Sequence, residues 1–180
     1  MSKQLVIFTI GHSTRSIKDF LAILKHYDIN QLVDIRTIAK SRHNPQFNGP
    51  SLARALRNHR IGYCHQKNLG GLRHTTAASI NKGWENSSFR GFANYMQTTE
   101  FEQSIEKLIK RSHKKTIVIM CAEAVPWRCH RSLIGDALLI RNIDVKDIYN
   151  ITTIKPHTLT PWAYVHDTTI TYPVYKKEKL

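Results

Sequence analysis

The sequence predicts an α/β protein, a Rossmann-like three-layer sandwich around a mostly parallel sheet of about five strands. Short β-branched and aliphatic runs alternate with segments whose apolar residues recur at helical spacing. The run TIVIMC at 116–121 is apolar throughout and uncharged, which is typical of a strand covered on both faces. The 180 residues predict one domain over 1–180, with the tail from about residue 164 as an extension.

The first predicted unit is a strand, a helix and a second strand. Residues 5–10 and 31–36 are the strands, because both are rich in aliphatic side chains. Ser16 is the expected N-cap of the helix between them, with Asp19 three residues later as in a capping box. A right-handed βαβ unit with a parallel strand pair is expected from this arrangement.

The remaining elements follow the same alternation. A third strand is expected at 61–65, and a long irregular stretch at 69–90 is typical of functional loops. A strand order of 3-2-1-4-5 would put the turns after the first and fourth strands side by side, where open α/β sheets bind ligands. The other predicted elements are helices after Pro50, at 89–96, from Thr99 as its expected N-cap to 111 and at 129–140, and strands at 116–121 and 145–149.

Basic residues are unevenly distributed. The chain has 27 Lys and Arg against 13 Asp and Glu, a net charge of +14. No acidic residue lies between Asp34 and Glu85, so this interval predicts a face that meets an anion such as a nucleotide or nucleic acid. Its basic residues are Arg36, Lys40, Arg42, Arg54, Arg57, Arg60, Lys67, Arg73 and Lys82.

The protein is expected in the cytoplasm and is not expected to associate with a membrane. No apolar run in the sequence is long enough to span a bilayer, and residues 5–10 lack the cleavage-site pattern of a signal peptide. The three cysteines have no paired zinc-ribbon spacing, which favours a reducing setting.

Two cysteines flank the turn after the 116–121 strand. Cys121 ends a buried strand, so its pKa is expected to be raised and the thiol inert. Cys129 is expected near a helix start, beside Arg128 and Arg131, where its pKa should be lowered. No metal site is predicted, because no standard zinc spacing is formed by Cys121, Cys129, His130 and His12. The sequence does not indicate a cofactor.

Six motifs follow one another along the chain: TIGHSTR at 9–15, VDIR at 33–36, SRHNPQF at 41–47, NLGGLR at 68–73, SFRGFANYM at 88–96 and CAEAVPWRCHR at 121–131. The chain resembles the bacterial family known as domain of unknown function 488, up to about Ala163. The resemblance implies an α/β protein and a set of motif positions, but no activity. TIAK at 37–40 departs from the family, which often has a proline there.

The polar motif residues form the expected site. His12, Glu123, Cys129 and His130 are the catalytic candidates. Arg42, Arg73 and Arg90 are expected on loops, where ligand-gripping residues tend to lie. The ligand-binding candidates are Ser13, Arg15, Asp34, Arg36, Arg42, Arg73, Arg90, Cys121 and Arg131.

Three functions are compatible with these residues. The first is binding of a phosphate-bearing small molecule or nucleic acid, with hydrolysis or group transfer as the reaction of a hydrolase or transferase. The second is a non-catalytic nucleic-acid-binding module with Tyr63, Trp84 and Phe89 as stacking platforms. The third is a thiol redox protein that uses Cys121 and Cys129.

Overall fold

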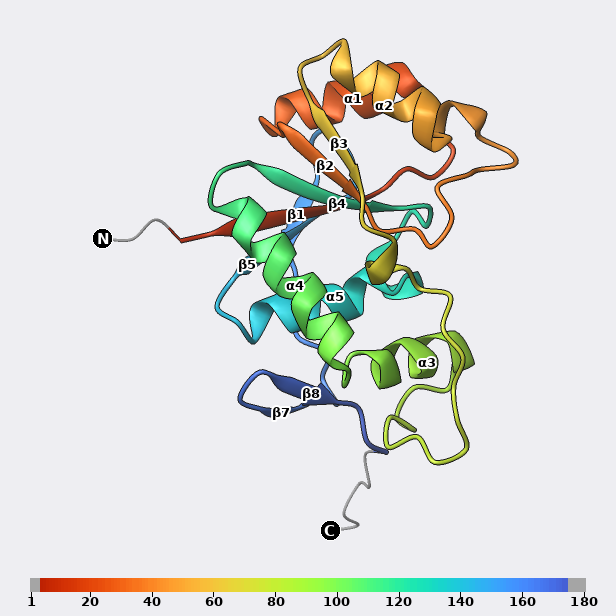
Figure 1. Ribbon diagram of the computed structural model, residues 1–180. Helices are drawn as coiled ribbons and strands as arrows, with labels where there is room; N and C mark the ends of the chain where they lie inside the picture. The colour runs from red at the N-terminus through yellow and green to blue at the C-terminus, as the bar shows by residue number, and fades with distance from the viewer. Residues whose placement is uncertain (1–3, 175–180) are drawn as a thin grey trace.

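A central sheet of six strands organises the computed structural model, which describes residues 4–174 (Figure 1). The strand order is β3-β2-β4-β1-β5-β6. All pairings are parallel except that of β5 with β6. The strands are β1 (Val6–Gly11), β2 (Gln31–Asp34), β3 (Gly62–His65), β4 (Ile117–Cys121), β5 (Asp144–Ile148) and β6 (Ile154–Pro156).

Helices cover both faces of this sheet, which confirms the predicted three-layer α/β fold. In Figure 1, α1 and α2 lie above the sheet and α3, α4 and α5 lie below it. Two buried apolar clusters match these layers, one on each face. Within residues 4–174, no helix is both long and apolar enough to cross a membrane. The helices are α1 (Ile17–His26), α2 (Gly49–Arg57), α3 (Ser87–Tyr95), α4 (Thr99–Ser112) and α5 (Arg131–Leu139).

The predicted strand order 3-2-1-4-5 is wrong in one respect, because β4 lies between β1 and β2. All five residues of β4 are buried, so its apolar run takes the position with a strand on each side. β1 and β2 therefore run parallel but do not pair. The turns after β1 and β4 are still adjacent, and the helices that follow these strands, α1 and α5, lie on opposite faces.

The N-terminal end of α1 agrees with the one predicted from the sequence, whereas those of α4 and α5 differ from the prediction. The Ser16 hydroxyl accepts a hydrogen bond from the Asp19 amide, as predicted. Thr98, not Thr99, caps α4, because the Thr98 hydroxyl accepts from the Phe101 amide. α5 begins at Arg131 instead of residue 129. Cys129 has extended backbone there (φ −136°, ψ 142°), after the 3-10 turn η3 (Pro126–Arg128).

The C-terminal tail has regular structure that the sequence did not predict. β6 adds to the sheet edge, and β7 (Tyr164–His166) pairs with β8 (Thr169–Thr171) as a hairpin. These strands have three residues each, too few for a period to be recognised. Tyr172 is fully buried in the cluster that also contains α5 side chains, so this part of the tail belongs to the core. Its status as an extension of the family fold stays a prediction, and residues 175–180 lie outside the described part.

A buried histidine ties the tail to the body of the fold. His157 Nε2 lies 3.0 Å from Asp136 Oδ1 of α5, and its Nδ1 lies 3.0 Å from Asp147 Oδ2 of β5. The Tyr172 hydroxyl donates to Asp136, and the Thr9 hydroxyl donates to Asp147. Burial alone would lower the pKa of His157, but the two carboxylates outweigh it and raise the pKa to about 9. The imidazolium is therefore the stable form at neutral pH.

His157→Gln is expected to destabilise the protein most at low pH. The folded pKa lies above the unfolded value of about 6.5, so this stabilisation is complete below about pH 6.5 and is lost as pH rises through 9. Urea unfolding should give a difference between wild type and variant that shrinks by roughly 3 kcal/mol from about pH 6 to pH 9.5. A difference that stays constant over this range would show that His157 is neutral in the fold. Titration of other groups in this range, such as the Cys121 thiol, affects the stability of both proteins equally and cancels from the difference.

Candidate functional site

A cavity of about 440 Å³ lies at the carboxyl ends of β2 and β4, where the sequence predicted the site. Its walls come from the turns after these strands, from the loop around Gly71 and from the start of α3. It is lined by Arg36, Thr37, Ile38, Lys40, Gly71, Leu72, Asn86, Ser88, Phe89, Cys121, Ala122, Glu123, Arg128, Cys129 and His130.

Two thiols and one guanidinium meet at the wall of this cavity. Cys121 Sγ lies 2.6 Å from Cys129 Sγ, and both side chains are buried. Arg131 Nη1 donates to Cys121 Sγ over 2.7 Å, and the Arg131 amide lies 3.5 Å from Cys129 Sγ. We call these three residues the thiol centre, and the cavity beside them the thiol cavity.

The predicted order of thiol acidity is wrong. Burial would raise the pKa of Cys121, but the hydrogen bond from Cys129 and the positive charge of Arg131 outweigh burial and lower it to about 7. The pKa of Cys129 is raised, by burial and then by its contact with the Cys121 thiolate. The reason is geometric. Arg131 follows Cys129 closely in sequence, but its guanidinium reaches back to Cys121, and Cys129 lies before the first turn of α5.

Main-chain carbonyls hold Arg131 against the thiols. Its Nη1 donates to the Glu123 carbonyl over 2.5 Å, and its Nη2 donates to the Ala124 carbonyl over 3.0 Å. Burial disfavours the charge, but the neighbouring cysteines raise the pKa of Arg131, so it stays protonated. The guanidinium is thus a fixed positive charge beside Cys121.

His130 is a neutral hydrogen-bonding partner of Cys129. Its Nε2 lies 2.9 Å from the Leu69 carbonyl and 3.3 Å from the Ile35 carbonyl, so this nitrogen carries the proton. Nδ1 is then an acceptor, 3.6 Å from Cys129 Sγ. Burial lowers the pKa of His130 to about 4. A Cβ on Gly71 would lie 2.4 Å from His130 Nδ1, so only glycine lets the loop approach the ring this closely.

The end of β1 runs beside the turn that carries Cys121. The amides of His12 and Ser13 donate to the carbonyls of Cys121 and Ala122. A Cβ on Gly11 would lie 1.7 Å from the Glu123 carbonyl oxygen, so glycine is required there. The first motif of the chain therefore shapes the thiol turn through its backbone.

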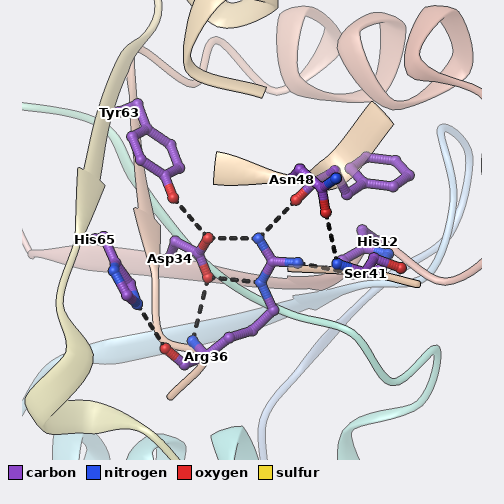
Figure 2. A network of polar contacts seen from close by, with 8 residues as sticks. His12, Asp34, Arg36, Ser41, Asn48, Tyr63 and His65 are labelled. Carbon is purple, nitrogen blue, oxygen red and sulfur yellow. Dashed lines mark hydrogen bonds and ion pairs between the residues drawn. The ribbon is translucent and has the colours of Figure 1, made fainter. Parts of the chain in front are cut away.

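Asp34 and Arg36 form a buried ion pair next to the thiol cavity (Figure 2). Arg36 binds the carboxylate through Nε at 2.9 Å and Nη2 at 2.6 Å, and the Tyr63 hydroxyl donates to the same carboxylate. Arg36 Nη2 also donates to the Phe47 carbonyl, and His65 Nε2 donates to the Arg36 carbonyl. The pair therefore joins β2 and β3 to the loop that precedes α2.

His12 also belongs to this network instead of the cavity wall. Its ring stacks on Phe47 with centroids 4.3 Å apart, and the side chain is buried. Nε2 lies 3.3 Å from Arg36 Nη1 (Figure 2). Nδ1 lies 2.8 Å from the Ser13 carbonyl, so both nitrogens have partners. Burial lowers the pKa of His12, with Arg36 acting in the same direction. The neutral ring donates through Nδ1 and accepts through Nε2.

Most of the predicted arginines bind main-chain carbonyls. Arg15 donates to the carbonyls of Gly11 and Tyr149. Arg73 donates to those of Gly70 and Asn68 and lies over the Tyr95 ring at 3.6 Å. Arg90 donates to the Trp84 carbonyl from within α3, so its expected place on a loop is wrong. Arg42 is exposed on its loop, with no hydrogen bond to the described residues.

Arg73→Ala is expected to destabilise the fold by about 1–2 kcal/mol, because it removes two hydrogen bonds and a cation–π contact. Arg42→Ala is the matched control and should stay within about 0.5 kcal/mol of wild type. Urea unfolding of both variants measures the difference. Equal stability of the two would mean that the Arg73 contacts contribute nothing to the fold.

Two cations that the sequence did not select line the thiol cavity. Lys40 and Arg128 are exposed there, without an ion pair or side-chain hydrogen bond to residues 4–174. Glu123 is also exposed at the cavity. Lys40 lies in the acid-free interval and Arg128 lies in the last motif, so charge and motif together could have selected them. Across the described residues, no group of three or more His, Cys, Asp or Glu side chains is placed to hold a metal ion.

Comparison with known proteins identifies the family. A family model described as Domain of unknown function DUF488 matches residues 16–138, which is more than half of the chain. No curated protein and no solved structure matches the chain. The matched segment contains β2, β4 and the thiol centre. The chain therefore belongs to the DUF488 family.

Proposed function

We propose that the protein is a thiol–disulfide oxidoreductase, with Cys121 as the attacking thiolate and Cys129 as the resolving thiol. The observation that carries this proposal is the position of Cys121 Sγ, 2.6 Å from Cys129 Sγ and 2.7 Å from Arg131 Nη1. A thiol beside a cation and a second thiol is the arrangement that redox-active cysteines require. Both cysteines line the thiol cavity, which gives a substrate access to them.

In the first step, the Cys121 thiolate attacks one sulfur of a substrate disulfide. A bond forms between Cys121 Sγ and that sulfur while the substrate S–S bond breaks. The other substrate sulfur leaves as a thiolate and takes a proton from water. The lowered pKa of Cys121, about 7, favours the thiolate and is close to the optimum for an attacking thiol near neutral pH.

In the second step, Cys129 attacks Cys121 Sγ of the mixed disulfide. The Cys121–Cys129 bond forms, and the bound half of the substrate leaves and receives the Cys129 proton. This proton is easier to remove than before, because a mixed disulfide at Cys121 carries no charge to raise the pKa of Cys129. Arg131, no longer facing a Cys121 thiolate, then stabilises the charge on Cys129.

The two steps reduce the substrate disulfide by two electrons and oxidise the protein dithiol to a disulfide. A reductant of the dithiol class must restore the two thiols for a further cycle. His130 acts as a positioning residue in this scheme. Its Nδ1 is a nitrogen acceptor 3.6 Å from Cys129 Sγ, and its own position is fixed by the Leu69 and Ile35 carbonyls.

The test is reaction of the reduced protein with glutathione disulfide, followed by intact mass spectrometry. Wild type is expected to lose about 2 Da as the internal disulfide forms, without a retained adduct. Cys129→Ser should stop at a glutathione adduct on Cys121, and Cys121→Ser should not react. Cys64→Ser is the matched control, because Cys64 lies on β3 outside the thiol cavity, and it should behave as wild type. A stable adduct on the wild-type protein would contradict a resolving role for Cys129.

A second candidate is the binding of a phosphate-bearing ligand, with hydrolysis or group transfer by Cys121. The observation that favours it is a pair of cations at the same cavity, Lys40 and Arg128, which have no side-chain partner within residues 4–174. In this reaction Cys121 Sγ attacks phosphorus and the leaving oxygen takes a proton from Glu123. Water then hydrolyses the thiophosphate with Glu123 as the base.

Cys129→Ser separates the two candidates. Phosphoryl transfer needs one thiol and should survive this substitution, whereas disulfide reduction should stop. A ligand that binds at Lys40 and Arg128 should also protect Cys121 from labelling.

If the ligand is nucleic acid held by about four cations, the log–log dependence of affinity on salt should have a slope near −3 to −4. No binding at low salt would remove nucleic acid as a partner.

A further inference from the structure

A second cavity, of about 460 Å³, lies beside β5 and β6 and shares no residue with the thiol cavity. The η3 turn separates them: Pro126 and Trp127 line the second cavity, whereas Arg128 lines the thiol cavity. The proposed reaction does not use this second cavity. We call it the aromatic cavity.

All three tryptophans of the chain, Trp84, Trp127 and Trp162, line the aromatic cavity together with Tyr149. The Trp84 and Trp162 rings are packed with centroids 5.0 Å apart. Trp127 is different, because 64% of it is exposed and its ring centroid lies 6.3 Å from that of Tyr149. An exposed indole beside a tyrosine offers a flat platform for a ring-shaped ligand.

The polar groups of the aromatic cavity favour an anionic ligand. Lys155 Nζ lies 5.5 Å from the centre of the Tyr149 ring, and the Lys155 side chain is exposed. The buried carboxylate of Asp147 is already bonded to His157 and Thr9, so it adds little free negative charge.

We propose that the aromatic cavity binds a nucleotide, with its base stacked on Trp127 and its phosphate near Lys155. Stacking on aromatic side chains beside a cation is the usual way in which proteins hold unpaired bases. Aromatic grooves also bind proline-rich peptides, but a chain of net charge +14 favours a phosphate-bearing partner over a peptide. The nucleotide can be free or part of a single strand, since both present the same base and phosphate.

Isothermal titration calorimetry at low salt tests the proposal with four probes: adenosine 5′-monophosphate, inorganic phosphate, an oligothymidylate and a proline-rich peptide. Trp127→Ala should weaken binding of the mononucleotide or the oligonucleotide about 10-fold, as expected for the loss of one stacked base. Lys155→Ala should weaken it less, and more at low salt than at high salt. Tyr164→Ala is the matched control, because Tyr164 is also 64% exposed but lies outside this cavity. It should bind as wild type does.

The four probes together show whether the bound base belongs to a free nucleotide or to a single strand. Binding of the mononucleotide assigns a free nucleotide, and binding of the oligonucleotide alone assigns a single strand, provided that Trp127→Ala weakens it. Oligonucleotide binding that Trp127→Ala leaves unchanged overturns the proposal, as does binding of the peptide or of phosphate alone, or no binding at all. Cys121→Ser should bind as wild type does, so failure of the thiol reaction leaves this result intact.

Discussion

Cys121→Ser is expected to abolish fast thiol labelling near neutral pH, whereas Cys129→Ser should retain it. Arg131 Nη1 lies 2.7 Å from Cys121 Sγ, and the pKa of Cys121 is lowered to about 7 while that of Cys129 is raised. The serine hydroxyl in Cys129→Ser can still donate to the Cys121 thiolate. A small reagent such as methyl methanethiosulfonate, with mass spectrometry of native protein at several pH values, measures the rates.

The rate of thiol labelling is expected to depend on pH. Only the thiolate reacts, so the labelling rate should rise with pH and reach half of its maximum near pH 7 in Cys129→Ser. Arg131→Gln should move this midpoint upward, because it removes the charge that stabilises the thiolate. Cys64→Ser provides the control for the third thiol. Labelling that is lost in Cys129→Ser and kept in Cys121→Ser would restore the acidity order that the sequence suggested.

That acidity order illustrates which features of the site follow from sequence and which do not. Apolar runs predicted β1, β2 and β4, and the parallel sheet then placed the 121–131 turn at the carboxyl edge. Both cysteines were therefore found. Their acidity depends on where one guanidinium points. Arg131 lies two residues after Cys129 in sequence, but its guanidinium donates a hydrogen bond to Cys121. Local spacing carries no information on such a contact.

The arginines show a related limit. An interval without acidic residues indicated a ligand, yet Arg73 and Arg36 bind carbonyls or a carboxylate of the chain itself. Main-chain carbonyls of a loop inside a fold need hydrogen-bond donors, just as a bound anion does. Sequence cannot distinguish these two needs, because both select arginine at loop positions. Lys40 and Arg128 are distinguished by their position at the thiol cavity together with their lack of partners among the described residues.

Arg36→Ala is expected to destabilise the fold by about 3–5 kcal/mol, the cost of leaving one partner of a buried ion pair alone. Asp34 is fully buried, and Arg36 supplies it with two side-chain hydrogen bonds and one from its amide. Arg36 also holds the Phe47 carbonyl and contacts His12, so the loop before α2 should loosen as well. Urea unfolding measures the loss, and Arg57→Ala on the exposed side of α2 should change little.

A double-variant cycle separates the ion pair from its surroundings. Asp34→Asn combined with Arg36→Met should cost less than the sum of the single changes, because neither partner is then left as an unpaired buried charge. Arg36 also lines the thiol cavity, so the same experiment decides what its guanidinium does. A loss below about 1 kcal/mol for Arg36→Ala would show that the fold does not depend on it. The guanidinium would then be available to hold an anion at the thiol centre, as the acid-free interval of the sequence first indicated.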